Sequence, residues 1–402
     1  MKVLMVHNCY GSSAPSGENQ VFEAEAALLK KKGHTVEKFL RHSDTIRGMG
    51  IVGTLKGALC TPWNPFAANA LKRNIELGMP DVVHVHNTFP LISPSIFRAI
   101  GGRAARVLTL HNYRLFCPAA IPMRMGKVCT ECLDNYSSIP SLKYGCYRDS
   151  RLATLPLAIN VGLQRFLGTW IKHVDAFIVL SEFQREKMIK AGLPAELVHV
   201  KSNFFPGQPN VLPWSSREPY IVFAGRLSLE KGLRSLIHAW KIWGKEAPEL
   251  RLVGDGDLRE ELELEVKDLP IKFLGQLSSL EAQRQVAGAR LLILPSEWFE
   301  GFPMVIREAF AFGTPAAVSD IGPLSSIVQH QVSGLVFRPA DPKSLVREVR
   351  TAWDDPGQLE RLGKGARVEF ERNYTEDVNY SSLKTVYEKA IDISKRRTSS
   401  KL

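Results

Sequence analysis

Two cationic side chains follow a short apolar run in the second half of the chain. In the segment FAGRLSLEKG, residues 223–232, Arg226 lies just after this run, and Lys231 comes five residues later, where a helix is expected to begin. Arg226 can donate two parallel hydrogen bonds to phosphate oxygens, and Lys231 adds a compact positive charge. Because a helix N-terminus also favours an anion, the segment predicts a phosphate-binding site. The alternative is a solvated strand-to-helix loop.

A second segment, PSEWFEGFPMVIRE at residues 295–308, carries Glu300 and Glu308 with seven residues between them. Gly301 and Pro303 predict a loop and then a helix that begins near Pro303, because proline fits the first helical position. Glu300 would lie at the start of this helix, with Glu308 about 7 Å further along its axis. Two carboxylates so placed suit the hydroxyls of two polyols better than one metal ion. The alternative is a capping Glu300 and a solvated Glu308.

Three aromatic residues in the same loop favour the binding interpretation. Trp298, Phe299 and Phe302 follow an expected core strand. A loop that exposes them needs a ligand or a partner domain to cover it, because large exposed apolar patches mark binding sites.

Polar residues also follow the expected strands of the first half. A loop from Asn8 to Asn19 contains Gly17, and its amides could bind a phosphate; a plain turn is the alternative. His111 ends the run VLTLHN and is expected to point into a cleft. His84 and His86 alternate in DVVHVHN, and we expect them on opposite sides of the strand, one packed and the other facing the cleft, in preference to a zinc pair.

Four cysteines lie in an irregular stretch at residues 112–150. Cys129 and Cys132 form a C-x2-C pair, and Cys117 and Cys146 flank it at distances that would close loops. A structural zinc held by the four thiolates is one interpretation and free thiols are another. Disulfides are the least favoured, because a reducing compartment is expected.

Short apolar runs alternate with helical patterns along the chain, which predicts an α/β fold with parallel sheets. The apolar runs fall at 3–6, 35–40, 81–86, 106–111, 176–180, 220–224, 250–253, 271–274, 291–294, 316–319 and 334–337. The proline-rich segment between the two series divides the chain into Rossmann-like domains at 1–205 and 220–375, a linker at 206–219, and a C-terminal helix with a frayed basic tail at 376–402. Ligands bind beyond the carboxyl ends of such strands, so we expect a central cleft between two facing sheets.

The charge distribution points to an anionic partner for the first domain. The net charge is +11, and the first 205 residues hold 25 basic and 14 acidic side chains, whereas the remainder holds 27 of each. Such an excess suits phosphate, nucleic acid or a lipid surface. Lys2 is followed at once by strand-like residues, so we expect no signal peptide and a cytoplasmic protein.

The longest apolar stretch, 152–171, contains Pro156 and Arg165 and is a poor membrane span. Its apolar residues recur at helical spacing, which favours packing against the domain core. The alternative is contact with an anionic membrane surface. The residues concerned are Leu152, Leu155, Ile159, Leu163, Phe166 and Trp170.

The pairing of GRLSLEKG at 225–232 with EGFPMVIRE at 300–308 resembles the retaining GT-B glycosyltransferases of family 4, the group 1 glycosyltransferases. FLGQL at 273–277, AFGTPAAVSD at 311–320 and SGLVF at 333–337 match the same family in the same order. The resemblance implies an acceptor-side first domain and a second domain that binds the nucleotide sugar. It implies that Arg226 and Lys231 bind the donor diphosphate, Glu300 the sugar hydroxyls and Glu308 the ribose, while the backbone of Gly301, Phe302 and Pro303 lines the sugar pocket.

By the same resemblance, Gly17 approaches the donor, although Ser16 stands where the family usually has another glycine, and His111 lies near the donor sugar. The implied catalytic set is His111, Glu300, Arg226 and Lys231. The implied activity is transfer of a hexosyl group to an acceptor hydroxyl with retention. The leaving phosphate takes the acceptor's proton, and catalysis requires no metal or other cofactor.

The expected partners are a nucleotide-sugar donor, a glycan or lipid-linked acceptor, and an anionic membrane at the inner face of the cytoplasmic membrane. This places the protein in bacterial cell-surface polysaccharide or lipid-linked glycan synthesis. An inactive nucleotide-sugar-binding protein is an alternative, because it would share most of these residues. A nucleic-acid-binding protein is disfavoured, since it would leave Glu300 unexplained and the chain lacks interleaved aromatic and basic residues. We therefore expect no nucleic-acid partner.

Overall fold

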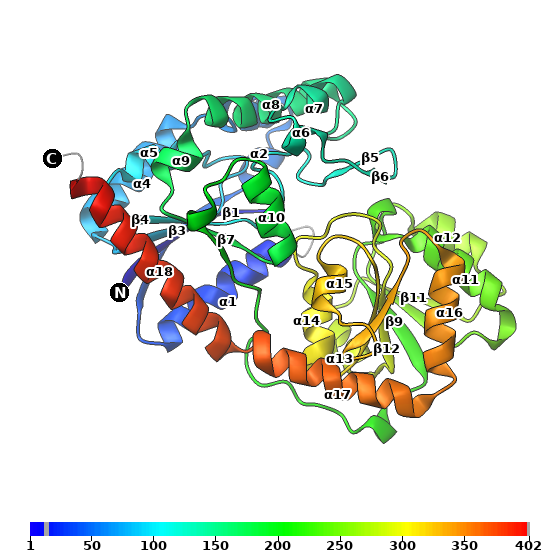
Figure 1. The fold of residues 1–402 in the computed structure, drawn as a ribbon. Coiled ribbons are helices and arrows are strands. Elements are labelled where there is room, and N and C mark those ends of the chain that lie inside the picture. The colour runs from blue at the N-terminus through cyan, green and yellow to red at the C-terminus, as the bar shows by residue number, and fades with distance from the viewer. Residues whose placement is uncertain (12–15, 400–402) are drawn as a thin grey trace. The chain divides into compact units, whose positions relative to one another are not determined.

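The computed structural model describes residues 1–11 and 16–399, and it divides into two compact units (Figure 1). The first unit comprises Met1–Pro122, Thr130–Ser202 and the chain from Asn379 onward. The second comprises Met123–Cys129 and Asn203–Val378. Each unit is built on a six-stranded sheet whose strand pairs are all parallel. The predicted α/β class with two parallel sheets is therefore confirmed.

The sheet of the first unit has the order β2-β1-β3-β4-β7-β8. The strand order reverses between β1 and β3, and a doubly wound sheet binds its ligands outside the carboxyl ends of the strands at this point. The register between β1 and β3 shifts between Val6 and His7, near those ends. The strands are β1 (Lys2–Cys9), β2 (Thr35–His42), β3 (Val82–Asn87), β4 (Ala105–Thr109), β7 (Ala176–Val179) and β8 (Val198–Val200).

Helix α1 (Gly17–Lys31) illustrates how the local sequence sets the elements of this unit. Ser16 caps it by accepting a hydrogen bond from the Asn19 amide, and Gly33, with a φ of 82°, lets the chain turn into β2. The other helices are α2 (Asp44–Arg47), α3 (Gly50–Cys60), α4 (Pro65–Gly78), α5 (Ile96–Ile100), α6 (Glu131–Asp134), α7 (Ile139–Tyr144), α8 (Arg151–Phe166), α9 (Thr169–His173) and α10 (Glu182–Lys190), and residues 195–197 form a 3-10 turn.

Helix α18 (Glu376–Ser399) completes the core of the first unit. Leu383, Val386 and Tyr387 pack in one buried cluster with residues of β1, α1, β3, β4 and β7. Arg397 donates hydrogen bonds to backbone carbonyls at Ile171 and at Val174. The expectation of a frayed basic tail is therefore wrong as far as residue 399, and its last three residues lie outside the described part of the chain.

The sheet of the second unit has the order β11-β10-β9-β12-β13-β14, so its strand order reverses between β9 and β12. The strands are β9 (Tyr220–Ala224), β10 (Glu249–Val253), β11 (Ile271–Gly275), β12 (Leu291–Leu294), β13 (Ala316–Ser319) and β14 (Gly334–Phe337). In Figure 1 this sheet lies between one helix group, α11 and α16, and another, α13 and α14. The helices are α11 (Leu233–Trp243), α12 (Arg259–Glu265), α13 (Ser279–Gly288), α14 (Met304–Ala311), α15 (Leu324–Ile327), α16 (Pro342–Trp353) and α17 (Pro356–Asn373).

Short elements complete the second unit. The predicted linker is irregular apart from a 3-10 turn at Trp214–Ser216, and further 3-10 turns occupy Leu229–Lys231 and Gly244–Glu246. A small hairpin, β5 (Met123–Arg124) and β6 (Lys127–Val128), belongs to this unit by its contacts although it comes from the cysteine-containing stretch.

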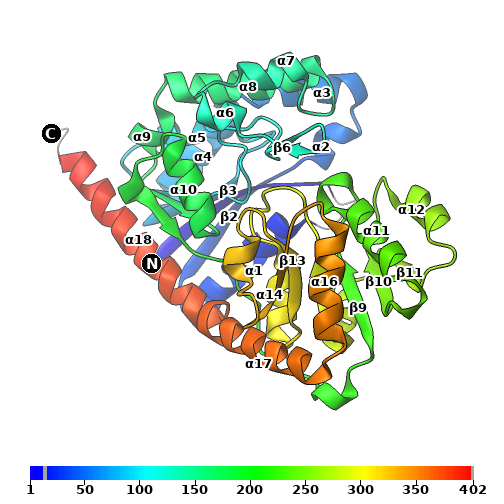
Figure 2. The same cartoon turned by 45° about the vertical axis from the view of Figure 1, so that its right-hand side comes forward.

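Helix α8 directs most of its apolar stripe to solvent. Leu152 is 83% exposed and Phe166 is 88% exposed, while the helix buries Leu157 and Val161 instead. The prediction of core packing is therefore wrong for most of the stripe, and Trp170 is its buried member. Helices α3 and α7 lie beside α8 (Figure 2), and they too expose large apolar side chains: Ile51, Val52, Leu55, Leu59 and Ile139. Within residues 1–11 and 16–399, no helix is long and apolar enough to span a membrane.

Candidate functional site

The first candidate site lies at the carboxyl ends of β9 and β12. Lys231 stands on the 3-10 turn after β9, two residues before α11 begins. Gly232 follows it with a φ of 70°, and a Cβ there would lie 1.9 Å from the carbonyl oxygen of Pro295. Only glycine therefore lets this turn approach the loop that follows β12 so closely.

This close approach brings Lys231 and Glu300 together. The Lys231 Nζ lies 2.7 Å from Glu300 Oε1, and the Ser296 hydroxyl donates to the same oxygen at 2.6 Å. The ammonium also lies 5.7 Å from the centre of the Trp298 ring. The carboxylate is buried but the lysine is half-buried, so the pair can be reached from solvent on its cationic side.

Arg226 and Glu308 are placed differently from each other. Arg226 is exposed just beyond β9, and its side chain forms no hydrogen bond or ion pair with the described residues. Glu308 lies on α14 with 16% of its side chain exposed, 3.4 Å from the Arg307 guanidinium. Burial raises the pKa of Glu308, and Arg307 opposes this shift. Glu308 is thus not the freely solvated residue of the alternative interpretation.

The loop between the two glutamates is more buried than expected. Gly301, Phe302 and Pro303 are all buried, and the Phe302 ring packs 5.6 Å from that of Tyr374. The prediction of three exposed aromatic residues is therefore wrong for Phe302, and Trp298 and Phe299 are half-buried. Pro303 is the N-cap of α14, so the helix begins at Met304, one residue after the expected start at Pro303.

The second candidate site is a pocket of about 60 Å³ in the first unit, large enough for a few water molecules. His111 lines it, two residues beyond the end of β4 rather than at its last residue. Glu18, at the start of α1, accepts hydrogen bonds from Asn112 at 2.7 Å and from Asn87 at 3.3 Å. Burial raises the pKa of Glu18. Other lining residues are His86, Thr88, Phe89 and Arg114.

The predicted phosphate loop is described only at its ends. Gly17 is the exposed first residue of α1, and Ser16 caps the helix. Ser16, which stands where the resembled family usually has a glycine, thus serves as the N-cap of α1. Residues 12–15 of this loop lie outside the described residues.

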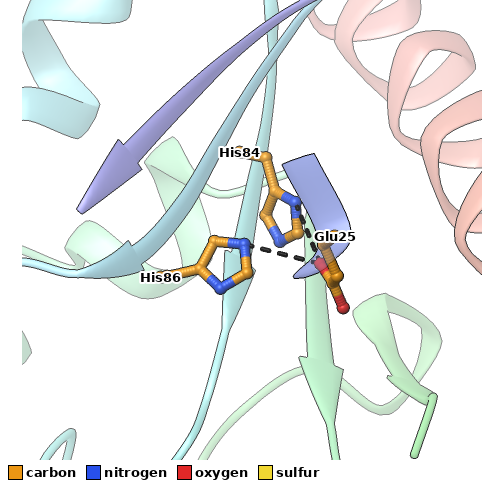
Figure 3. A group of neighbouring side chains, drawn as sticks. All are labelled: Glu25, His84 and His86. Atoms are coloured by element: carbon orange, nitrogen blue, oxygen red, sulfur yellow. Dashed lines mark ion pairs between the residues drawn. The ribbon is translucent and has the colours of Figure 1, made fainter. Parts of the chain in front are cut away.

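His84 and His86 both point to the same side of β3, where they meet Glu25 of α1 (Figure 3). The prediction that they face opposite sides is wrong, because residues two apart on a strand share a face. His86 Nε2 lies 3.5 Å from Glu25 Oε2, and His84 Nδ1 lies 4.0 Å from the same oxygen. His86 Nδ1 also lies 3.0 Å from His111 Nε2.

Glu25 and Lys201 are site residues that the sequence reasoning missed. The Lys201 ammonium bonds to Glu25 Oε1 where both side chains are almost fully buried. A local signal for Glu25 did exist, because it falls on the buried face of α1 between Phe22 and Leu29. A charged residue on an apolar helix face needs a buried partner.

The surroundings lower the pKa of several histidines here. Burial lowers the pKa of His111 to about 3 and puts that of His86 and His84 well below the ordinary value. The neighbouring histidines and Lys201 add to this effect, because positive charges disfavour protonation. All three rings are therefore neutral near pH 7.

Possible metal ligands come together at one place within residues 1–11 and 16–399, namely Glu25, His84 and His86. This set fits a cation poorly. Lys201 already neutralises the carboxylate, and both nitrogens of His84 are engaged, Nδ1 by Tyr387 at 2.8 Å and Nε2 by Thr109 at 2.7 Å.

The four cysteines of the zinc prediction do not form such a group in the described chain. Cys117 is buried, its thiol points at the Ile121 carbonyl, and burial raises its pKa to about 12. No disulfide joins any cysteine of the described chain. A zinc site at Cys117, Cys129, Cys132 and Cys146 stays a prediction that a metal assay can test.

Two family models match successive parts of the chain. The model described as Glycosyltransferase Family 4 matches residues 16–206, and the model described as Glycosyl transferases group 1 matches residues 205–369. Together they cover residues 16–369, which leaves out β1, the end of α17 and helix α18.

Relatives and solved structures agree with these models. An uncharacterized glycosyltransferase of Methanocaldococcus jannaschii is 32% identical over 184 residues, which are 44% of this chain and 47% of that protein. The amylovoran biosynthesis glycosyltransferase AmsK of Erwinia amylovora is 25% identical over 229 residues, 54% of this chain and 56% of its own length. The chain thus spans about half the length of these curated relatives. The structure of Anabaena HepE in complex with UDP-glucose matches with a TM-score of 0.64 and 20% identity, covering 96% of this chain and all of that one, which supports the same fold.

Proposed function

Because this chain belongs to the group 1 glycosyltransferases of family 4, we propose that it transfers a hexosyl group from a nucleoside-diphosphate sugar to an acceptor hydroxyl. The observation that carries this proposal is the Lys231–Glu300 pair at the point where the second sheet reverses its strand order. A cation for the diphosphate and a carboxylate for sugar hydroxyls stand there side by side. Parallel sheets bind phosphorylated ligands at such points.

The second unit is the proposed donor-binding unit. Arg226, exposed and without an ion-pair partner in the described chain, would grip the diphosphate together with Lys231. Glu300 would accept hydrogen bonds from the sugar hydroxyls, and Glu308 from those of the ribose. The backbone of Gly301, Phe302 and Pro303 would line the sugar pocket. UDP-glucose is the first donor to test, because the similar Anabaena protein was crystallised with it.

The proposed reaction retains the configuration of the anomeric carbon. The bond between this carbon and the diphosphate oxygen breaks, and negative charge grows on the diphosphate. Arg226 and Lys231 would stabilise that charge more strongly than the ground state, which lowers the barrier. The leaving phosphate oxygen takes the proton of the acceptor hydroxyl as the new glycosidic bond forms. His111 of the first unit completes the proposed catalytic set by contact with the transferred sugar, and Gly17 is the proposed donor contact at the start of α1.

The proposed acceptor is a glycan or a lipid-linked glycan at an anionic membrane surface, as in bacterial surface polysaccharide synthesis. The apolar side chains that α3 and α8 expose support this, since a helix with an exposed apolar face can lie in a membrane interface. The basic excess of the first half supports an anionic surface. The polysaccharide role of the Erwinia relative supports the pathway.

Flotation with anionic liposomes tests the proposed binding to an anionic membrane surface. We expect Phe166→Ser combined with Leu152→Ser to reduce co-flotation of the protein. Leu264→Ser, which changes a 70% exposed leucine of the second unit, is the matched control and should leave flotation unchanged. Equal flotation of all three proteins would contradict the proposed surface.

A thermal-shift panel of UDP-, GDP-, ADP- and dTDP-sugars tests the donor site. We expect one donor to raise the Tm, because a ligand at a hundredfold excess over its Kd stabilises the native state by about 2.7 kcal/mol. Arg226→Ala should abolish the shift. Arg361→Ala, which removes an exposed arginine of α17, should preserve it.

Release of nucleoside diphosphate on addition of an acceptor then separates an enzyme from an inactive binding protein. A donor shift that Arg226→Ala leaves intact would count against the proposed site.

A further inference from the structure

A row of four buried or half-buried polar side chains crosses the first unit: Lys201, Glu25, His86 and His111. The ammonium bonds to Glu25 Oε1, Glu25 Oε2 lies 3.5 Å from His86 Nε2, and His86 Nδ1 lies 3.0 Å from His111 Nε2. His111 is the member that lines the pocket together with His86. His111 is also the one member of the row that the mechanism proposed above uses.

The middle contact joins two atoms that have no other partner. Among the residues that the structure describes, neither Glu25 Oε2 nor His86 Nε2 has a hydrogen-bond partner, and both are buried. Buried polar atoms are rarely left unsatisfied. The 3.5 Å ion-pair contact makes each atom the candidate hydrogen-bond partner of the other.

The position of the protons follows from the chemistry of the carboxylate. Glu25 is paired with an ammonium, so its oxygens accept hydrogen bonds and do not donate them. A hydrogen bond between these two atoms requires the proton of His86 to be on Nε2. A neutral imidazole has a single N–H, so His86 Nδ1 accepts, and the proton in the contact with His111 belongs to His111 Nε2.

We propose that Glu25 is a positioning residue which, through His86, holds His111 in the tautomer protonated at Nε2. His111 then presents Nδ1 as a hydrogen-bond acceptor. This nitrogen can accept from a hydroxyl of the transferred sugar but cannot donate to a phosphate oxygen. The inference deepens the proposed function and rests on it only for the contact between His111 and the sugar.

The neighbouring groups are consistent with this assignment. The low pKa of His86 and of His111 leaves one proton on each ring near pH 7. His84, the other histidine near Glu25, is held away by its hydrogen bonds to Tyr387 and Thr109. Lys201 supplies the charge that keeps the carboxylate an acceptor.

Nitrogen-15 NMR of histidine-labelled protein without substrate reads the tautomer directly. We expect His111 to show a protonated Nε2 and an unprotonated Nδ1, with its signals identified by their loss in His111→Gln. In Glu25→Gln the side-chain amide can turn its NH₂ group towards His86, so His111 should become a mixture of both tautomers. A His111 protonated at Nδ1 in the unaltered protein would overturn the proposal.

A second variant guards against a folding defect in Glu25→Gln. The double variant Glu25→Met/Lys201→Met replaces the buried ion pair with apolar side chains, a change that proteins often tolerate. It should show the same mixture of tautomers, and an unchanged single tautomer in both variants would overturn the proposal.

Activity provides the last measurement once a donor is known. We expect both variants to lose kcat about 10- to 100-fold, the range for removing a partner that orients a functional histidine, with a smaller change in the donor KM. If His111 becomes a mixture of tautomers in these variants but kcat is unchanged, the positioning role of Glu25 is overturned. Absence of transfer activity in the unaltered protein would instead count against the proposed function, and the tautomer measurement would stand.

Discussion

Each unit of the molecule contains a lysine–glutamate pair beside its parallel sheet, and the two pairs differ in their access to solvent. In the second unit, the side chains of Lys231 and Glu300 are 18% and 6% exposed. In the first unit, those of Lys201 and Glu25 are 1% and 0% exposed. In the half-buried pair, solvent access would let Lys231 leave Glu300 and bind a ligand instead. The sealed pair cannot separate in this way, and it orders the protons of its neighbours instead. Two identical residue types thus have different tasks because their surroundings differ.

The largest expected effect is on stability and should separate the two pairs. Lys201→Met leaves Glu25 as an unpaired buried charge, so we expect the free energy of unfolding to fall by about 3–5 kcal/mol. Lys231→Met should cost less, about 1–3 kcal/mol, because solvent reaches that pair on its lysine side and Ser296 still donates to Glu300. Urea denaturation measures both. Equal losses would mean that the difference in burial has no energetic weight.

The next effect is on catalysis. Here the change at the half-buried pair should have the larger effect, the reverse of the order expected for stability. Lys231→Met removes a cation from the growing charge on the diphosphate, so we expect kcat to fall about 10²- to 10³-fold. Steady-state kinetics under conditions where each variant is folded provides the measurement. Lys364→Met, at an exposed position of α17, is the control. A kcat that survives in Lys231→Met would move the donor diphosphate away from this residue.

A smaller effect concerns acid. Burial lowers the folded-state pKa of His7, His84, His86 and His111, so the unfolded chain binds more protons below pH about 6.5. The stability that these neutral rings contribute is present above that pH and is lost as the pH falls towards the lowered values. We expect the first unit to open before the second on acidification. Pulse-labelling hydrogen exchange, read peptide by peptide after exposure to pH 7, 5 and 4, measures this order. Earlier opening of the second unit would contradict it.

The strands of both sheets except β8 could be predicted because their signals are local. Strands β9, β12, β13 and β14 have the predicted bounds, since apolar runs bounded by glycine, proline and charge identify them. The approach of Lys231 to Glu300 was not predicted. It depends on Gly232 fitting against Pro295, a contact between loops that follow different strands.

Errors arose where the sequence defines a pattern but not its surroundings. Helical spacing identified the apolar stripe of α8, but not whether anything covers it. The same limit applies to Phe302, whose burial depends on Tyr374, more than seventy residues away in the chain. Glu25 and Lys201 are 176 residues apart, so no local motif links them.

Helix α18 makes the order of biosynthesis matter. Tyr387 completes the buried cluster of the first unit and forms a hydrogen bond with His84, so without it the core is incomplete and His84 lacks this partner. A ribosome makes residues 1–202 long before it reaches position 387. The first unit is therefore the first to be started by the ribosome but the last to be completed. Until α18 is made, apolar side chains of its core stay exposed and can be bound by chaperones.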